Sequence, residues 1–358
     1  MPAVFTATTA AGGTEVWVTN GLPGGTHLLK DIYPGATSAI PQFDRHLTAI
    51  NGQALFSATN PATGTEVWVT DGTTAGTHIL RYFNPGAGDG GATDIVTLGG
   101  KGVFFSYDGT APTLWTTDGT TGGTHAAGGA LPPGFVALMA DAVVLGGQIL
   151  FQGFSGTGYE LWPTDSTIGG THLVRDIDPR VNAAGPLGSS PAGMTVVGSV
   201  VVFAAATDTG TELWASDGTK AGTVLLQDID TGFSSFPKDF TTVGSQCFFI
   251  SDDEVHGEEL SVTDGTPSGT RLVRDIDPGV GGSVPGALQS IALGTKLIFA
   301  ANDGVRGSEL WVSNGAAGGT KLLKDLSPGS DGSDPSHFIA AGGKVVFQCP
   351  RRSALICG

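Results

Sequence analysis

Hydrophobic residues in this chain occur in short runs, separated by polar segments that are rich in glycine. One stretch holds four such runs, at 48–50 (TAI), 53–59 (QALFSAT), 66–70 (EVWVT) and 77–83 (THILRYF). Asn51-Gly52 separates the first two runs and is a strong hairpin signal. Asp71-Gly72 begins the break before the fourth run, because aspartate can bond its own backbone and glycine tolerates a positive φ. No stretch shows a 3.6-residue apolar period, so the pattern predicts antiparallel strands and almost no helix.

The same phrase occurs seven times along the chain. Six copies carry a tryptophan in the third run: Trp17, Trp68, Trp115, Trp162, Trp214 and Trp311. The remaining copy, GEELSVTDGTPSGTRLVRDIDPG, has Ser261 at this position. The steps between these markers are 51, 47, 47, 52, 47 and 50 residues, and a Gly-Thr pair follows eight and nine residues after every marker. Four strands in a unit of about 40–50 residues are typical of a propeller blade, so the sequence predicts an all-β, seven-bladed β-propeller of four-stranded antiparallel blades.

The two ends of the chain fit a ring that both termini close. The first unit begins with AVFTAT (3–8), which is a second strand, so this unit lacks an innermost strand. SHFIAAGG (336–343) is an innermost strand without a blade of its own, and its pairing with the first unit would remove open sheet edges. We therefore predict a propeller over residues 1–343 and an extra C-terminal strand and tail over 344–358. KVVFQC (344–349) resembles another second strand, which begins a truncated further blade or replaces the N-terminal strand.

The third run and the turn after it carry a family resemblance. EVWVTDGT (66–73), TLWTTDGT (113–120) and ELWASDGT (212–219) resemble the bacterial ELWxxDGT repeat, and looser copies extend the resemblance to about Gly343. The resemblance implies a repeat β-propeller from a large secreted or surface-attached bacterial protein, and no settled activity. We therefore expect a secreted or cell-surface location, although the first residues lack the charged start and apolar core of a signal peptide.

The repeated residues themselves are predicted to be structural. The tryptophan is large enough to wedge between adjacent blades. The aspartates after it would cap the turn from the third to the fourth strand, namely Asp71, Asp118, Asp165, Asp217 and Asp264. Asn20 and Asn314 replace aspartate in two copies, which favours turn capping over a charge-dependent role such as metal binding. Glu66 and its equivalents begin the third strand, and Thr113 in one copy again favours a local hydrogen bond over chemistry.

Composition narrows the classes of partner. The net charge of −16 argues against nucleic acid and anionic membranes, whose binding requires clustered lysine and arginine. No apolar run reaches the roughly 18–20 residues that span a bilayer. No G-x-S-x-G, H-E-x-x-H or G-x-x-x-x-G-K motif is present. Cys247 is expected to be buried, Cys349 and Cys357 could form a disulfide, and three cysteines do not fix the compartment.

Candidate ligand-binding residues lie on irregular loops. In propellers the loops from the second to the third strand, and from the outer strand to the next inner strand, share one face, here called the loop face. Its irregular segments are 33–44, 84–94, 178–193, 251–259 and 327–337. Residues that begin inner strands would ring the channel mouth: Asp44, His46, Asp94, Asp239, Gln289 and His337. Carboxylates with loop carbonyls would suit Ca²⁺, and a solvated pore lip is the alternative.

Four copies of the repeat read GTH, with His27, His78, His125 and His172. They begin the outer strands of successive units and are expected to lie too far apart to bind one zinc ion.

Three functions are compatible with the sequence. The favoured one is a non-catalytic, monomeric binding or scaffold module that recognises a glycan or protein through the loop face. The second is an enzyme, a hydrolase or lyase with a Ca²⁺-dependent site at the channel mouth. The third is a structural segment of a larger surface protein. Fold alone does not decide among them.

Overall fold

The structure is a computed structural model, and it describes residues 3–40, 47–84, 86, 88–92, 94–107, 111–284 and 286–349. Its regular structure is almost entirely β-strand, with two single 3₁₀ turns at Pro267–Gly269 and Ala317–Gly319. The described ranges contain no α-helix, so the predicted all-β class is confirmed. The chain divides into two compact units, Met1–Leu173 and Val174–Gly358.

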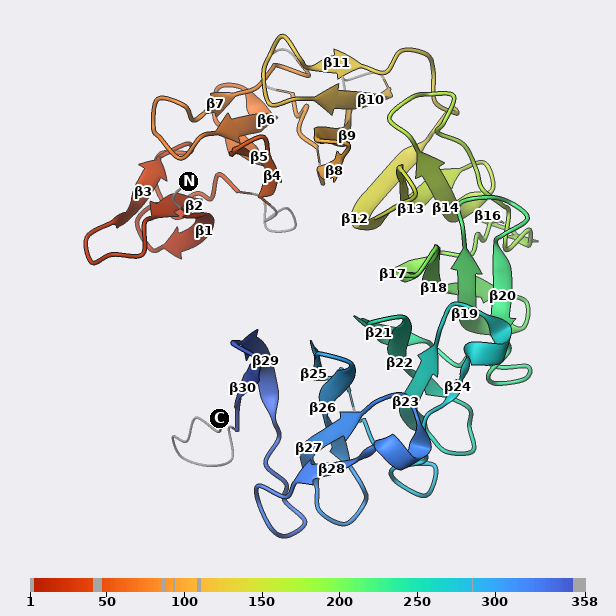
Figure 1. Ribbon diagram of the computed structural model, residues 1–358. Coiled ribbons are helices and arrows are strands. Elements are labelled where there is room, and N and C mark those ends of the chain that lie inside the picture. The colour runs from red at the N-terminus through yellow and green to blue at the C-terminus, as the bar shows by residue number, and fades with distance from the viewer. Residues whose placement is uncertain are drawn as a thin grey trace. The chain divides into compact units, whose positions relative to one another are not determined.

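The first unit consists of antiparallel sheets in chain order (Figure 1). The opening sheet has three strands, β1 (Ala3–Thr9), β2 (Gly13–Thr19) and β3 (Thr26–Lys30). Two four-stranded sheets follow. The first has β4 (Thr48–Ile50), β5 (Gln53–Asn60), β6 (Gly64–Thr70) and β7 (His78–Ile79). The second has β8 (Val96–Leu98), β9 (Lys101–Tyr107), β10 (Pro112–Thr117) and β11 (His125–Ala126). The last sheet of this unit has β12 (Val136–Leu145), β13 (Gln148–Ser155) and β14 (Gly158–Thr164). Among the described residues, the opening sheet has three strands and no fourth, inner strand, as the sequence predicts.

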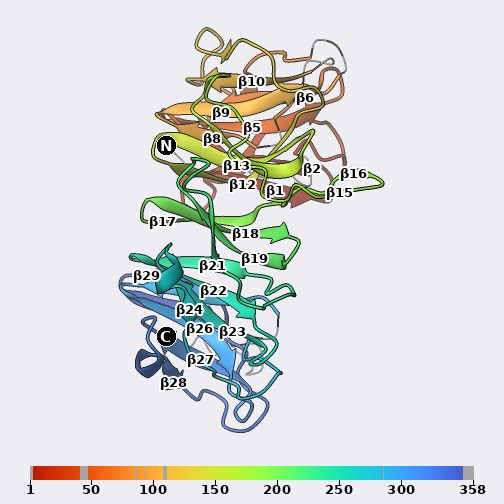
Figure 2. The ribbon, with the colours of Figure 1, turned by 90° about the vertical axis from the view of Figure 1, so that its right-hand side faces the viewer.

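The second unit begins with a small hairpin, β15 (Val181–Asn182) and β16 (Gly185–Pro186). Three four-stranded sheets follow, which Figure 2 shows one after another. They are β17 (Ala192–Val197), β18 (Val200–Thr207), β19 (Gly210–Ser216) and β20 (Val224–Gln227); then β21 (Lys238–Val243), β22 (Gln246–Asp252), β23 (Glu258–Thr263) and β24 (Arg271–Leu272); then β25 (Ser290–Leu293), β26 (Lys296–Asn302), β27 (Ser308–Ser313) and β28 (Lys321–Lys324). The hairpin β29 (Ser336–Ala341) and β30 (Lys344–Gln348) ends the described chain.

The turn between β4 and β5 follows from its sequence. Asn51 and Gly52 both have a positive φ, of 45° and 77°, and Ile50 is paired with Gln53 across them. Two residues with positive φ form the tight turn whose twist matches that of the flanking strands. The predicted hairpin at Asn51-Gly52 is therefore confirmed.

The outer strands are shorter than the apolar pattern predicts. The predicted strand 77–83 is wrong in length, because β7 contains only His78 and Ile79. Beyond it, Leu80 N donates to Val67 O at 2.9 Å, and Phe83 N donates to Glu66 Oε2 at 2.9 Å. At the end of this segment, the Glu66 side chain thus replaces the backbone hydrogen bonds of a strand pair.

Two kinds of loop lie side by side within each sheet of the second unit. A Cβ on Gly210, the first residue of β19 after the turn from β18, would lie 2.0 Å from the carbonyl oxygen of Phe233, which follows β20. A Cβ on Gly257, between β22 and β23, would lie 2.7 Å from Val280 O, which follows β24. These contacts confirm that the two kinds of loop share a face.

The chain ends form hairpins of their own. β29 pairs with β30, and β1 pairs with β2. The boundary expected at 343/344 falls in the turn of the last hairpin, between Ala341 and Lys344. The closing pairing of the C-terminal strand with the first sheet stays a prediction.

Candidate functional site

The DGT turn is a closed network of hydrogen bonds. Asp71 Oδ1 accepts hydrogen bonds from Thr73 N at 2.8 Å and from Thr73 Oγ1 at 2.7 Å. The hydroxyl of Thr73, together with its N–H, lowers the pKa of Asp71. The same two bonds hold Asp118, Asp165, Asp217 and Asp264. Asn20 and Asn314 accept the backbone bond from the residue two positions on. These carboxylates therefore bind their own turns.

The Gly-Thr pair completes this turn. A Cβ on Gly76 would lie 2.1 Å from Asp71 Oδ1, so a side chain at this position would displace the carboxylate. Thr77 Oγ1 donates to Thr73 O at 2.7 Å and lies 2.7 Å from Thr70 Oγ1. The close approach to the capping residue recurs at Gly25, Gly123, Gly170, Gly222, Gly269 and Gly319. This packing explains why all seven copies carry Gly-Thr.

The tryptophan fills a socket between neighbouring sheets. Trp68 of β6 is 4% exposed and belongs to a core cluster that includes Val16, Leu29 and Ile32 of the preceding repeat. Its ring lies 6.5 Å from that of Phe56, and its Nε1 donates to Ala58 O at 3.2 Å. In the second unit, Trp311 likewise clusters with residues of the preceding sheet.

A cation covers the open side of this socket. Lys30 Nζ lies 5.5 Å from the centroid of the Trp68 ring and donates to Thr77 O at 2.6 Å. Equivalent cations stand 13 residues after the marker in Arg81, Arg175, Arg274 and Lys324, and Arg81 and Arg175 lie over Trp115 and Trp214. The sequence interpretation missed this role, although the 13-residue spacing of the basic residues is a readable signal. These cations join consecutive repeats, because contacts between a cation and an aromatic face are attractive.

The glutamate of the ELW segment is buried and binds a loop. Glu66 is fully buried, and Glu259 accepts hydrogen bonds from Asp277 N at 3.1 Å and Ser283 Oγ at 2.6 Å. Burial raises the pKa of Glu15, Glu66, Glu212 and Glu259, against hydrogen bonds that lower it. Each of these side chains ties the third strand to the segment after the outer strand. The sequence predicted a local hydrogen bond at this position, whereas the backbone partners lie 17 or 18 residues further along the chain.

The predicted channel-mouth residues are placed in part. Asp44 and His46 lie outside the described residues, and Asp94 precedes β8 in the first unit. Asp239, Gln289 and His337 begin consecutive inner strands of the second unit. Asp239 Oδ2 accepts a hydrogen bond from Leu288 N at 2.8 Å, and Gln289 Oε1 accepts one from His337 N at 3.5 Å. The structure thus brings Asp239, Gln289 and His337 into one row. The side chains of Asp239 and Gln289 each accept a hydrogen bond from the backbone of the next repeat.

The other candidate ligands are dispersed. His27, His78, His125 and His172 are exposed, each just after the Thr of a Gly-Thr pair. In the acidic segment 251–259, Asp253 Oδ2 lies 2.8 Å from His256 Nδ1, and this contact raises the pKa of His256. Within the described part of the chain, no three or more His, Cys, Asp or Glu side chains gather so that they could hold a metal ion. Cys357 lies outside the described residues, so its pairing with Cys349 stays a prediction.

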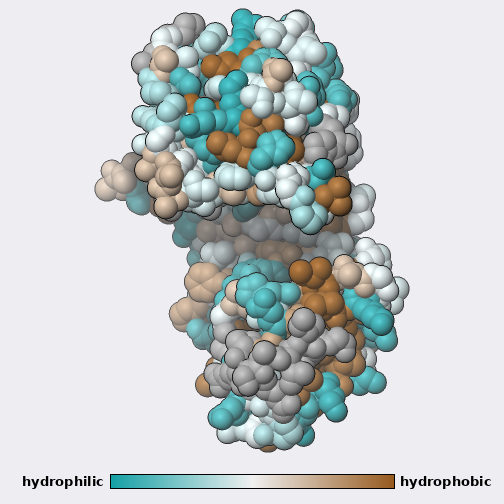
Figure 3. Space-filling model, turned by 90° about the vertical axis from the view of Figure 1, so that its left-hand side faces the viewer, coloured by the Kyte–Doolittle hydropathy of each residue, from teal (hydrophilic) through white to brown (hydrophobic). Residues whose placement is uncertain are grey.

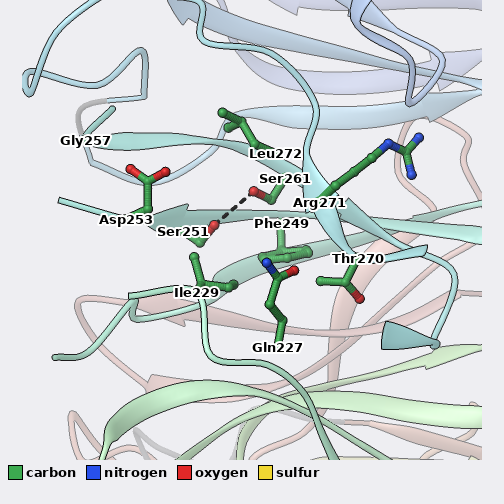
Figure 4. A pocket seen from close by; sticks show the side chains of 10 residues that line it. All are labelled: Gln227, Ile229, Phe249, Ser251, Asp253, Gly257, Ser261, Thr270, Arg271 and Leu272. Carbon is green, nitrogen blue, oxygen red and sulfur yellow. Dashed lines mark hydrogen bonds between the residues drawn. The ribbon is translucent and has the colours of Figure 1, made fainter. Parts of the chain in front are cut away.

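One socket between sheets lacks its tryptophan. At Ser261 a cavity of about 80 Å³ opens between the sheets β17–β20 and β21–β24 (Figure 4). Gln227 of β20 and Ile229, which follows this strand, line it on one side, while Phe249, Ser251 and Ser261 of the second sheet line it on the other. Ser251 Oγ donates to Ser261 Oγ at 2.9 Å, which is the dashed line in Figure 4. Ser261 is the only one of the seven marker positions that does not carry a tryptophan.

Comparison of this chain with known proteins found similar solved structures at low sequence identity. No family model and no curated protein matches it. Similar solved structures include TolB from Acinetobacter baumannii, with 12% identity and a TM-score of 0.34 over 92% of this chain and 80% of that one. A prolyl endopeptidase has 13% identity and a TM-score of 0.47, over 96% of this chain and 52% of that one. A puromycin-hydrolysing peptidase of Mycobacterium tuberculosis has 12% identity and a TM-score of 0.45, over 97% and 57%.

The chain therefore spans little more than half of each peptidase. The all-β fold rests on the chain's own strands. No helix in the described residues is long and apolar enough to cross a membrane.

Proposed function

We propose that this protein is a non-catalytic binding module, secreted or at a cell surface, that recognises a protein or glycan through its loop face. The repeated polar residues support this proposal, because Asp71, Thr77, Glu66 and their equivalents are occupied by bonds within the framework. Specific recognition then falls to the residues that do not repeat. Function commonly lies on loops that a rigid scaffold holds.

The observation that carries the proposal is the exposed apolar side chains of the loop face. In the second unit, the large apolar residues of the loop face are mostly exposed, with exposed fractions of 69% for Val181, 62% for Phe233, 61% for Phe236, 65% for Val255, 79% for Val280 and 70% for Val305. They come from both kinds of loop, which lie against each other within a sheet. Exposed apolar groups that gather on one face mark interaction sites.

A binding assay with matched variants tests this function. The purified protein is applied to a glycan array and, separately, cross-linked to extracellular proteins of its own source. Phe233→Ser with Phe236→Ser should abolish the binding found in either arm. Leu22→Ser is the control, because Leu22 is 64% exposed in the turn at Asn20-Gly21, the counterpart of the DGT turn away from the loop face. Equal loss in both variants, or a partner that tolerates the double change, would contradict the proposal.

We further propose that the repeats close into a seven-bladed ring, as members of the ELWxxDGT repeat family would. The terminal hairpin supports closure, because it exposes residues that other sheets bury. Val346 is 39% exposed, whereas Leu55, at the same place in its sheet, is fully buried. A groove of about 270 Å³ beside it is lined by Leu293, Ile298, Leu310, Leu323, Lys324, Leu326, Val345 and Phe347. Figure 3 shows apolar side chains gathered on this side of the second unit.

A disulfide test decides on closure. Ile339 is paired with Val346 as Thr48 is with Leu55, and Val4 with Val18 as Leu55 is with Val69. Closure by β29 therefore places Ile339 opposite Val4. Ile339→Cys with Val4→Cys should form an intrachain disulfide on mild oxidation, which either single variant cannot form. Disulfide-linked dimers alone would favour pairing between chains and overturn intrachain closure.

A further inference from the structure

The socket at Ser261 matches the socket of Trp68 residue by residue. Phe249, Ser251, Ser261, Thr270 and Leu272 each stand 193 positions after Phe56, Ala58, Trp68, Thr77 and Ile79. Gln227 and Ile229 stand 197 positions after Lys30 and Ile32, the step that separates Trp214 from Trp17. All seven of these later residues line the cavity. The cavity therefore has the walls that elsewhere enclose an indole ring.

Two residues of the indole site change together at this junction. Ser261 removes the ring, and Gln227 removes the cation. This cation lies over a tryptophan ring in three places, as Lys30, Arg81 and Arg175, and a basic residue occupies the same repeat position in Arg274 and Lys324. Phe249 keeps the place of Phe56, whose ring stacks on Trp68. Ser251 pairs with Glu259 as Ala58 pairs with Glu66, and Ala58 O accepts the indole N–H of Trp68. An apolar wall, an acceptor and a polar cover thus persist without their usual occupant.

We propose that this cavity, the Ser261 socket, binds a planar aromatic ring of the indole class from outside the chain. The ring would stack on Phe249, donate its N–H to the Ser251 carbonyl, and lie beneath the amide of Gln227. The inference does not depend on the loop-face function proposed above.

The size of the socket is compatible with partial insertion of such a ring. Its volume of about 80 Å³ far exceeds the ~10–15 Å³ that one water needs, and is about half of the ~150 Å³ cavity that admits benzene. Gln227 is exposed, so its flexible side chain can move aside at the mouth. The ring can therefore leave one edge in solvent.

Fluorine NMR of 5-fluoroindole tests the proposal directly. Addition of the wild-type protein should broaden and shift the ¹⁹F line in a saturable manner, and 5-fluoroindole should raise the melting temperature. Ser261→Trp places the repeat's own residue in the socket and should weaken binding at least tenfold. Leu22→Trp adds a tryptophan at an exposed position away from the loop face and should bind as the wild type does. An unchanged ¹⁹F line with the wild type, or equal binding by Ser261→Trp, would overturn the proposal.

A second variant keeps the test decisive if Ser261→Trp does not fold. Gln227→Lys restores the cation over the socket and should tighten the binding of 5-fluoroindole severalfold, because a cation over a ring face attracts it. Binding that is unchanged or weaker in this variant would contradict the placement of the ring.

N-acetyltryptophanamide as a competitor separates two sources of the ring. Competition indicates a tryptophan side chain of a peptide. No competition, with 5-fluoroindole binding retained, indicates a free small molecule. Phe233→Ser with Phe236→Ser should leave 5-fluoroindole binding unchanged, which keeps this inference distinct from the loop-face function.

Discussion

Replacement of Trp68 by alanine should cause a large loss of stability. The ring is 4% exposed, and its removal leaves a cavity against Val16, Leu29 and Phe56. Loss of a buried aromatic side chain from a core costs about 3–5 kcal/mol. The change also deprives Ala58 O of its hydrogen bond from the indole, which adds about 1 kcal/mol. Since 1 kcal/mol shifts the melting temperature by about 2–4 °C in a domain of roughly 150–250 residues, a fall of about 10 °C or more is expected.

Urea unfolding followed by far-UV circular dichroism measures this loss. Trp115→Ala provides an internal comparison. Trp115 is only half-buried and meets Phe83 edge-on, although Arg81 lies over its ring as Lys30 lies over Trp68. We expect the midpoint to fall further for Trp68→Ala than for Trp115→Ala. A midpoint that stays at the wild-type value, or the reverse order of the two variants, would refute the view that buried indole rings hold neighbouring sheets together.

Three further predictions concern the framework of the repeat. Asp71→Asn should change the melting temperature little, because Asn20 and Asn314 accept the same backbone bond. Gly76→Ala should lower the melting temperature strongly, because its Cβ would lie 2.1 Å from the Asp71 carboxylate. The opposite order of the two variants in thermal melts would contradict this account of the turn. Burial raises the pKa of Glu66 in the folded state above its usual 4.5, so the folded protein binds more protons and stability should fall as pH rises from 4.5 through the raised pKa. Glu66→Gln should flatten this slope in a series of melts at different pH, and an unchanged slope would exclude Glu66 as a cause. Lys30→Gln copies the natural Gln227 and should destabilise the protein mildly at low and high salt alike, because the cation is held against a ring; a loss confined to low salt would indicate a screened surface charge instead.

Part of the candidate site was readable from the sequence. The DGT turn could be predicted because Asp71 and Thr73 interact within three residues, and local hydrogen bonds of this kind depend little on the rest of the fold. The roles of Glu66 and Lys30 were missed, since their partners, Phe83 and Thr77, lie 17 and 47 residues away in the chain. The predicted length of the outer strand failed for the same reason.

The sequence by itself determined the all-β class, the number and spacing of the repeats, and the chemistry of their turns. These properties follow from short-range periodicity and from turn residues whose backbone preferences act locally. Only the tertiary structure decided that Ser261 leaves a cavity, because the walls of that socket come from two sheets and from residues as far apart as Gln227 and Leu272. The sequence predicted that Asp239, Gln289 and His337 begin inner strands. Only the tertiary structure showed that Asp239 and Gln289 each bond the backbone of the next repeat, because those bonds depend on how consecutive sheets pack against each other.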